Sequence, residues 1–511
     1  MNYLTMTSGR RWAITVSIML AAMMNTLDTT IANVALPHIQ GSVGASQEQI
    51  TWVLTSYLIA AAVMTPLTSW CAERFGRKEL FLISIGGFTA ASLLCGIATS
   101  LPEIVLFRLF QGLSGAALLP LSQAVLLDIN PPENHGQAMS IWGAGAVLGP
   151  VLGPVMGGWL TDNWSWRWVF LINLPVGVLA FIGVMFFMSE ERHKNPRPFD
   201  FQGFATLTLA IACLQLMADR GPTKDWLGSP EIWAYIILCG LGLYWFIIHT
   251  LTTNKRPFFN PEMFADRNFL TCTVIGFMIG LLLYGSMALL PPLMENLLGY
   301  PVLTTGLVQM PRGIGMLISM LFIGQLVNRI DVRLLVLGGL ALNAVSAWQM
   351  AHFNLQMSTG PLVISAFLQG LGTAMIFVPL STMAFATLSP ALRTEGAAFY
   401  TLMRNIGSAI GISIIQAIHV DSIQTAHARL VEHLRPDNPL VQSSGVDLAT
   451  TAGQLMANGM AERQAAMLAY VNDFYIMLAV AVLIAPLMLF VRTPSAARAA
   501  RAGNIASAAV E

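Results

Sequence analysis

Ionisable side chains inside long apolar stretches are the residues of this chain with the clearest capacity for chemistry. Asp28 lies in one apolar run, and Arg108, Arg312 and Arg404 interrupt others. A charged group at such a position is costly unless it has a partner or a function. Burial favours the neutral form of a carboxylate, whereas a nearby arginine favours its charged form. A carboxylate subject to both influences can take up and release a proton.

The composition places these residues in a membrane protein. The chain has 511 residues, of which 55% are hydrophobic and 10% are charged, and its mean hydropathy is +0.65. A soluble chain carries about a quarter charged residues. Acidic and basic residues number 26 each, so the charge balance implies no nucleic-acid partner. The cysteine and histidine spacings give no pattern of metal ligands.

Fourteen apolar runs are long enough to cross a bilayer, which takes about 20 residues per helix. They predict an all-α polytopic membrane protein. An even number of spans places both termini on one side. Most lysines and arginines fall on that side, so the positive-inside rule predicts cytoplasmic termini. The runs lie near 12–36, 50–70, 80–100, 103–127, 138–160, 167–187, 201–218, 231–252, 269–291, 303–327, 333–352, 361–387, 397–418 and 472–491.

Asp28 and Arg108 are predicted to lie at compatible depths in the membrane. With a rise of about 1.5 Å per residue, Asp28 lies roughly 12 Å inside the outer end of its helix. Arg108 lies roughly 7 Å inside the outer end of another helix. We therefore expect Asp28 to face a central cavity and to carry the exchanged proton, with Arg108 as its partner or charge modulator. A static structural ion pair is the alternative.

A regular spacing of small residues predicts close helix packing in the fifth span. The stripe consists of Gly145, Gly149, Gly153 and Gly157. Glycines four residues apart let a second helix approach to backbone contact where lipid removes the hydrophobic drive. Pro150 and Pro154 each remove a backbone donor and should bend this helix. The pattern predicts a pivot or seal between moving helices, with a static packing face as the alternative.

The chain contains a weak internal repeat. The segment 111–113 (QGL) reappears at 369–371, and 120–122 (PLS) reappears at 379–381. A six-helix unit would repeat after roughly 200 residues, so the longer offset is explained by a helix pair inserted between two such units. Two six-helix bundles plus two inserted helices are therefore predicted. Transporters built from such parallel repeats bind substrate between the halves, near the middle of the membrane.

The predicted organisation has four parts: an N-terminal bundle at 12–187, the inserted pair at 201–252, a C-terminal bundle at 269–491 and a disordered cytoplasmic tail at 492–511. Within the C-terminal bundle, the polar stretch 419–471 has apolar residues at helical spacing. It predicts an amphipathic helical hairpin on the outer side. We expect this hairpin to dock a partner protein, with folding over the transporter as the alternative. The inserted pair is compatible with a passive spacer, a lipid-facing support or a transport role.

Four segments carry motifs that resemble a known family. They are LDTTIANVALP at 27–37, RLFQG at 108–112, the Gly-Pro stripe of the fifth span, and WRWVFLINLP at 166–175. Together they resemble the fourteen-helix drug:proton antiporters of the major facilitator superfamily, of the EmrB and QacA type. The likeness covers nearly the whole chain and is greatest to the EmrB-like multidrug efflux subunits. In the cytoplasmic turn after the second helix, Ser69 and Glu73 stand where the family usually has Gly and Asp.

The resemblance implies a proton-coupled antiporter that exports hydrophobic toxic compounds or drugs across the bacterial inner membrane, driven by the proton gradient without a cofactor. It also implies a tripartite efflux pump, with a membrane-fusion adaptor protein and an outer-membrane channel as partners. A dedicated exporter of one metabolite, such as a fatty acid or siderophore, is the alternative. A polytopic membrane enzyme would need clustered acids, a nucleophile–base pair or metal ligands, and neither these nor a GxxxxGK[ST] loop occurs.

The resemblance and the buried charges together predict two sets of functional residues. The substrate-cavity set is Asp28, Asn33, Gln111, Arg312 and Arg404. The conformational set is Glu73, Arg74, Arg77, Gly149, Pro150, Gly153, Pro154 and Gly157. One central acid against three intramembrane arginines predicts a cavity that favours apolar weak acids or neutral compounds over cationic dyes.

Overall fold

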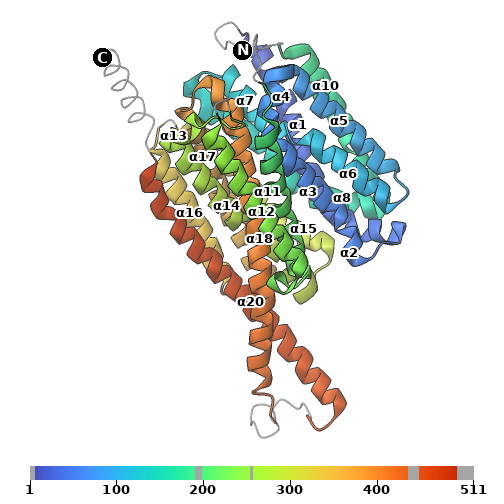
Figure 1. Ribbon diagram of the computed structural model, residues 1–511. Coiled ribbons are helices and arrows are strands. Elements are labelled where there is room, and N and C mark those ends of the chain that lie inside the picture. Colours follow the sequence, from blue (N-terminus) through green and yellow to red (C-terminus); the bar gives the residue numbers. More distant parts are fainter. Residues whose placement is uncertain (1–5, 190–197, 254–256, 328, 436–447, 492–511) are drawn as a thin grey trace.

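The computed structural model describes residues 6–189, 198–253, 257–327, 329–435 and 448–491, which form long helices joined by short turns (Figure 1). It contains 14 helical segments that are long and apolar enough to cross a membrane. The number of predicted spans is therefore confirmed. The all-α class is confirmed as well, since the described residues include no strand. The tail predicted at 492–511 lies outside the described residues.

The helices run between two faces of the molecule. We call the face at which α1 begins the terminal face, and the opposite face, where α18 and α20 project, the hairpin face (Figure 1). The first bundle consists of α1 (Ser8–Val43), α3 (Trp52–Met64), the 3-10 turn η2 (Thr65–Leu67), α4 (Thr68–Phe75), α5 (Arg77–Ile97), α6 (Leu101–Gly115), α7 (Leu118–Ile129), α8 (His135–Asn163) and α10 (Asn173–Phe187), with α2 (Gln47–Ile50) and α9 (Trp168–Leu171) as short helices at the hairpin face.

Two inserted helices precede the second bundle. They are α11 (Phe201–Arg220) and α12 (Pro230–Thr252), joined by the 3-10 turns η4 (Gly221–Thr223) and η5 (Trp226–Gly228). The second bundle consists of α13 (Glu262–Ala265), α14 (Arg267–Pro292) with the π-helical turn η6 (Leu293–Leu297), α15 (Val302–Leu326), α16 (Val332–Met350), α17 (Thr359–Ala386), α18 (Arg393–Val431) and α20 (Thr451–Ile484) with the 3-10 turn η8 (Ala485–Phe490).

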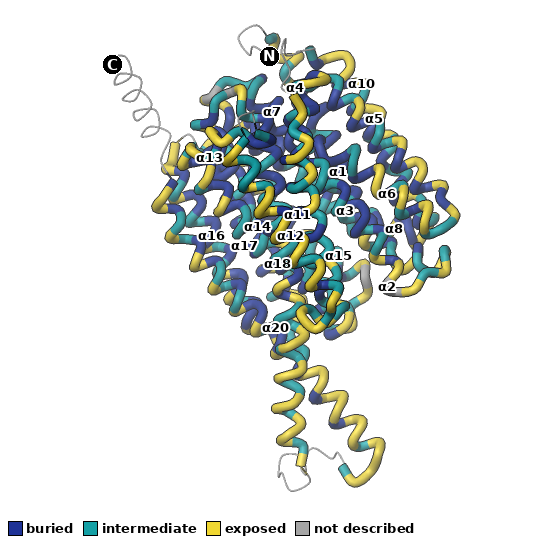
Figure 2. The backbone as a smooth tube through the Cα atoms, viewed as in Figure 1, coloured by how far each residue is buried: buried dark blue, intermediate teal, exposed yellow. Residues whose placement is uncertain are grey.

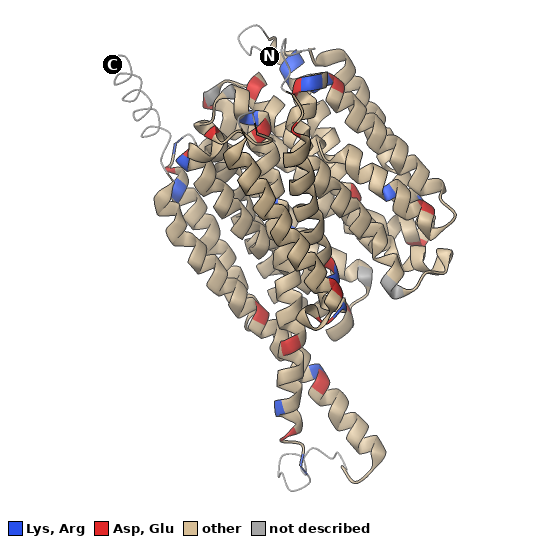
Figure 3. Cartoon of the chain, in the orientation of Figure 1, with Lys and Arg blue, Asp and Glu red and all other residues tan. Residues whose placement is uncertain are grey.

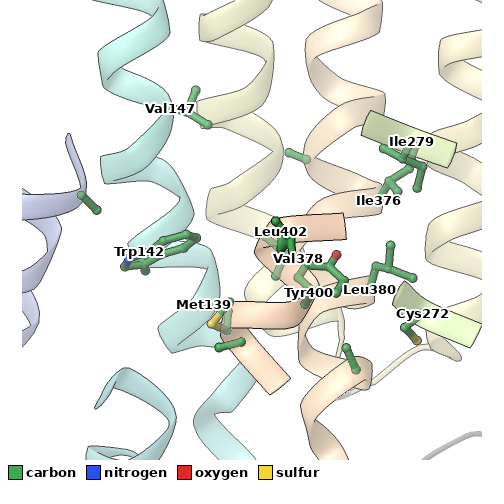
Figure 4. Close-up of a cluster of buried hydrophobic side chains, with 14 of the residues drawn as sticks. Met139, Trp142, Val147, Cys272, Ile279, Ile376, Val378, Leu380, Tyr400 and Leu402 are labelled. Atoms are coloured by element: carbon green, nitrogen blue, oxygen red, sulfur yellow. The ribbon is translucent and has the colours of Figure 1, made fainter. Parts of the chain in front are cut away.

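The two bundles meet along two sets of helices. α8 packs against α15, and α18 packs against α7, α4 and η2. Buried apolar side chains from both bundles form one continuous cluster, which includes Met139 and Trp142 of α8 and Tyr400 and Leu402 of α18 (Figure 4). The residues between the bundles are therefore closely packed in this conformation.

The glycine stripe of α8 packs against α1 inside the first bundle. A Cβ atom added at Gly149 would lie 2.5 Å from the backbone nitrogen of Leu27, so only glycine fits there. Thr26 Oγ1 of α1 donates a 2.8 Å hydrogen bond to the Ala146 carbonyl of α8. α8 runs without a break through both of its prolines. The close approach thus lies within one bundle, and a pivot role stays a prediction.

α18 and α20 continue beyond the bundle as a projecting hairpin. They have 39 and 34 residues, and their extensions contain most of the described part of the polar stretch 419–471; residues 436–447 of that stretch lie outside the described residues. The hairpin extends away from the other helices rather than folding over them (Figure 1), and most of its residues are exposed (Figure 2). At the opposite end of the molecule, several Lys and Arg residues lie near the terminal face (Figure 3).

Candidate functional site

A buried carboxylate cluster lies inside the first bundle. Asp28 Oδ2 of α1 accepts a 2.5 Å hydrogen bond from Arg108 Nη1 of α6. Asp28 Oδ1 accepts 2.9 Å hydrogen bonds from Gln111 of α6 and Asn173 of α10. All four side chains are 0% exposed. The structure thus brings Asp28, Arg108 and Gln111 together, and their role in proton coupling stays a prediction.

Aromatic rings and a backbone carbonyl fix the Arg108 guanidinium beside Asp28. Nε of Arg108 donates a 3.1 Å hydrogen bond to the Val53 carbonyl of α3. Its Cζ lies 4.4 Å from the centroid of the Tyr57 ring and 5.6 Å from that of Phe170. Cation–π contacts are strongest when the cation is desolvated, as it is here. Nη2 has no hydrogen-bond partner among the described residues, so one nitrogen of the guanidinium is unpaired.

Helix geometry explains how these side chains converge. Arg108 and Gln111 are three residues apart and therefore lie on one face of α6. Asn173 stands at the start of α10, and its Nδ2 also donates a 3.0 Å hydrogen bond to Ser92 of α5. Sequence reasoning missed Asn173 as a site residue. The available signal was a single amide side chain inside the apolar run 169–175.

A second polar cluster lies in the second bundle at the pseudo-equivalent place. Ser286 of α14 and Gln369 of α17 follow Asp28 and Gln111 by 258 residues each. Gln369 Nε2 donates a 2.7 Å hydrogen bond to Ser286 Oγ. Arg312 Nη2 of α15 donates to Ser286 Oγ at 3.1 Å and also to Gln369 Oε1.

Among the residues that the structure describes, no carboxylate pairs with Arg312 of this second cluster. The side chain is 9% exposed, and its Nη1 atom has no hydrogen-bond partner among the described residues. The position that is acidic in the first cluster is occupied by the Ser286 hydroxyl. The second cluster therefore holds a buried guanidinium whose charge is not balanced by a neighbouring acid.

Two other predicted cavity residues make different contacts. The half-buried Arg404 of α18 lies 5.3 Å from the centroid of the Phe377 ring, and Phe377 stacks on Trp142 of the first bundle at 6.1 Å. Arg404 thus lies where the bundles meet. Asn33 is exposed and donates a 3.3 Å hydrogen bond to the Thr29 carbonyl of its own helix. The structure does not bring Asn33 into either cluster.

Charged residues near the terminal face link the two bundles. Asp128 of α7 forms an ion pair with Arg77 of α5 and accepts a 2.9 Å hydrogen bond from Arg393 at the start of α18. Glu73 lines a small pocket beside Arg77, and Arg74 is exposed. The pairing of Asp128 with Arg393 was missed, since no pattern in the sequence relates two residues 265 positions apart.

Comparison with known proteins finds relatives over most of the chain. Residues 18–412 match the family model of the Major Facilitator Superfamily. The chain is 35% identical to the multidrug export protein EmrB of Haemophilus influenzae, over 84% of each chain. It is also 35% identical to the fatty acid resistance protein FarB of Neisseria gonorrhoeae, over 88% of each chain. In fold it is similar to the proton:xylose symporter XylE, with a TM-score of 0.63 and 14% identity over 96% of this chain and 97% of the other.

Proposed function

Because the chain belongs to the Major Facilitator Superfamily, we propose that it is a proton-coupled antiporter that exports hydrophobic toxic compounds across a bacterial inner membrane. Its sequence similarity to EmrB-type multidrug export proteins supports hydrophobic toxic compounds as the class of substrate. The observation that carries the proposal is the fully buried Asp28 carboxylate. Ionisable residues at membrane depth are rare and mark proton relays and substrate pathways. The distribution of Lys and Arg supports cytoplasmic termini.

The surroundings of Asp28 provide a means of linking the proton to the substrate. Arg108, Gln111 and Asn173 donate hydrogen bonds to the carboxylate. A movement or a competing substrate that takes Arg108 away leaves the carboxylate without its cation, and a proton can then take the place of that cation. Substrate binding and proton binding then affect each other through one guanidinium.

The charged bridge at the terminal face is the proposed cytoplasmic latch. Asp128 connects Arg77 of the first bundle to Arg393 of the second. Opening between the bundles on this side separates Asp128 from Arg393. We assign Glu73 and Arg74 to the same conformational step, together with the glycine stripe of α8, which keeps α1 and α8 in backbone contact.

Transport by reconstituted vesicles under an imposed pH gradient tests the proposal. We expect the wild-type protein to move a hydrophobic toxic compound only while the gradient lasts. Asp28→Asn should lower this transport at least tenfold, because the amide cannot exchange a proton. Asp162→Asn is the matched control, since this aspartate is exposed near the end of α8. Equal transport by Asp28→Asn and the control would contradict the proton-carrying role.

A dedicated exporter of one amphipathic acid is the second candidate, and Arg312 favours it. A buried guanidinium without an acidic neighbour suits a substrate that brings its own carboxylate. FarB, whose name records fatty acid resistance, is as similar to this chain as EmrB is. Competition separates the candidates: a long-chain fatty acid and unrelated neutral toxic compounds should displace each other from a multidrug site. Export of the acid alone would support the dedicated exporter.

We propose that the hairpin of α18 and α20 docks a membrane-fusion adaptor, which would join the pump to an outer-membrane channel. Leu455, Met456 and Met460 of α20 are 58–69% exposed there. Exposed apolar side chains rimmed by polar residues mark protein interaction sites. Replacing all three by serine should abolish co-purification of a co-expressed adaptor and leave transport in vesicles intact. Retention of the adaptor would contradict this docking role.

A further inference from the structure

The inserted helix α11 lies between the two bundles rather than beside one of them. α11 packs on α12 and also on both α3 and α18. α12 is the more peripheral helix. Of its apolar membrane-spanning segment, 11% is buried inside the protein, compared with 33% of the segment that contains α11. The pair therefore has one helix turned outward and one helix placed at the joint between the first and second bundles.

Two consecutive residues near the end of α11 attach it to different bundles. Asp219 Oδ2 accepts a hydrogen bond from Thr55 Oγ1 of α3, in the first bundle. The carbonyl oxygen of Ala218 accepts a 2.6 Å hydrogen bond from Ser413 Oγ of α18, in the second bundle. Ser413 is 2% exposed, so this contact lies in a buried place. The end of α11 at the hairpin face thus joins the bundles through two hydrogen bonds.

The bundles meet differently at their two ends. Near the terminal face, α4 and η2 pack directly on α18, and Asp128 pairs with Arg393 across the joint. Toward the hairpin face, α3 packs on α11, and α11 packs on α18. Along α3, α4 and α18, a direct contact between the bundles at one end is therefore replaced by a contact through the inserted helix at the other, whereas α8 packs directly on α15.

The attachment to α3 is the stronger of the two. The Asp219 side chain accepts a hydrogen bond from the Thr55 hydroxyl. Next to it, the Arg220 guanidinium lies 5.6 Å from the Trp52 ring centroid of α3 and pairs with Glu231 of α12 at 3.1 Å. The contact with α18 has the neutral Ser413 hydroxyl and a backbone carbonyl. The weaker attachment is therefore the one to the second bundle.

We propose that the end of α11 is a clasp that holds the bundles together at the hairpin face, and that opening on this side separates Ser413 from Ala218 while α11 stays with α3. This inference rests on the proposed transport function, since it assigns the inserted helices a part in the opening of one side. Ser413, Asp219 and Thr55 are then positioning residues, which set the opening equilibrium without touching substrate.

Distances between spin labels test the clasp on the full chain. The five native cysteines are buried, so labels can be directed to cysteines introduced at exposed positions. Asp162 marks the first bundle, Asp421 marks the second and Thr223 marks the end of α11; all are exposed. We expect Ser413→Ala to increase the population with a long 162–421 distance about fivefold, the effect of one hydrogen bond. Thr206→Ala is the control, because this hydroxyl bonds only within α11.

The same labels show which bundle α11 follows. In the long-distance population the 223–162 distance should stay unchanged, whereas the 223–421 distance should increase. A 162–421 distribution in Ser413→Ala that equals the wild type, or a constant 223–421 distance, would overturn the clasp. These distances are measured without substrate or a pH gradient. Absence of proton-driven transport would therefore refute the proposed function and leave this result standing.

Discussion

The two polar clusters occupy pseudo-equivalent places in the two bundles and differ in charge. Around Asp28, an acid and the Arg108 guanidinium neutralise each other, and two amides complete the carboxylate's hydrogen bonds. In the second bundle, the glutamine is kept at the same repeat offset, the acid is replaced by Ser286, and Arg312 enters from a different helix. The two clusters thus share a glutamine at repeat-related positions, but the acidic residue of the first cluster is a serine in the second.

The difference favours two different ligands in the proposed function. The first cluster contains the carboxylate that we propose as the proton carrier. The second cluster contains a guanidinium that suits an anionic substrate. Placing the two sites in opposite bundles would let one relative movement of the bundles affect both.

Removing each arginine should have very different consequences for stability. Arg108→Gln leaves the Asp28 carboxylate buried without its cation, and losing one partner of a buried pair costs about 3–5 kcal/mol. Arg312→Gln removes a guanidinium that has no acidic partner, so we expect little loss or a small gain. Thermal unfolding in detergent measures both, with the two variants matched in chemistry. Equal destabilisation would show that Arg312 has a counter-charge that the resting structure does not reveal.

Giving the second cluster an acid should remove its capacity for anions. In Ser286→Asp the new carboxylate can pair with Arg312, as Asp28 pairs with Arg108. We expect the affinity for a lipophilic acid to fall at least tenfold, which corresponds to about 1.4 kcal/mol, while the affinity for a neutral compound stays within about twofold. Ser286→Asn is the control of similar size without charge. Unchanged binding of the acid to Ser286→Asp would place the anion site elsewhere.

The fold was predictable from the sequence because its determinants are local. Each span is an apolar run of membrane length, and the repeat offset alone indicates two bundles with an inserted pair. Helix ends were less predictable. α18 and α20 continue as helices well beyond the apolar runs, since hydropathy reports where lipid ends and not where the backbone changes conformation.

Site residues could be predicted from the sequence where their depth along a helix determines which residues meet. They could not be predicted where the contact depends on how two helices pack against each other. Asp28 and Arg108 could be matched by depth, and Ser286 was accessible through the offset that relates Gln111 to Gln369. The contacts of Asn173 and Asp219 depend on how α10 and α11 pack against their neighbours. The periodicity of a sequence does not indicate how a helix is rotated against its neighbours, so these contacts were identified only in the structure.

The smallest expected difference between the bundles concerns a pair of pseudo-equivalent glycines, Gly153 of α8 and Gly411 of α18. A Cβ atom at Gly411 would lie 2.5 Å from the backbone Cα of Leu281, which cannot move without shifting α14. At Gly153 the nearest atoms belong to the Thr30 side chain, and the nearest backbone atom, the nitrogen of Ile31, is 3.3 Å from the added atom. We therefore expect Gly411→Ala to destabilise the protein by about 1 kcal/mol more than Gly153→Ala, a typical cost of overpacking. Thermal unfolding of the two single variants measures this difference, and a larger loss for Gly153→Ala would mean that the joint between α1 and α8 is the more rigid of the two.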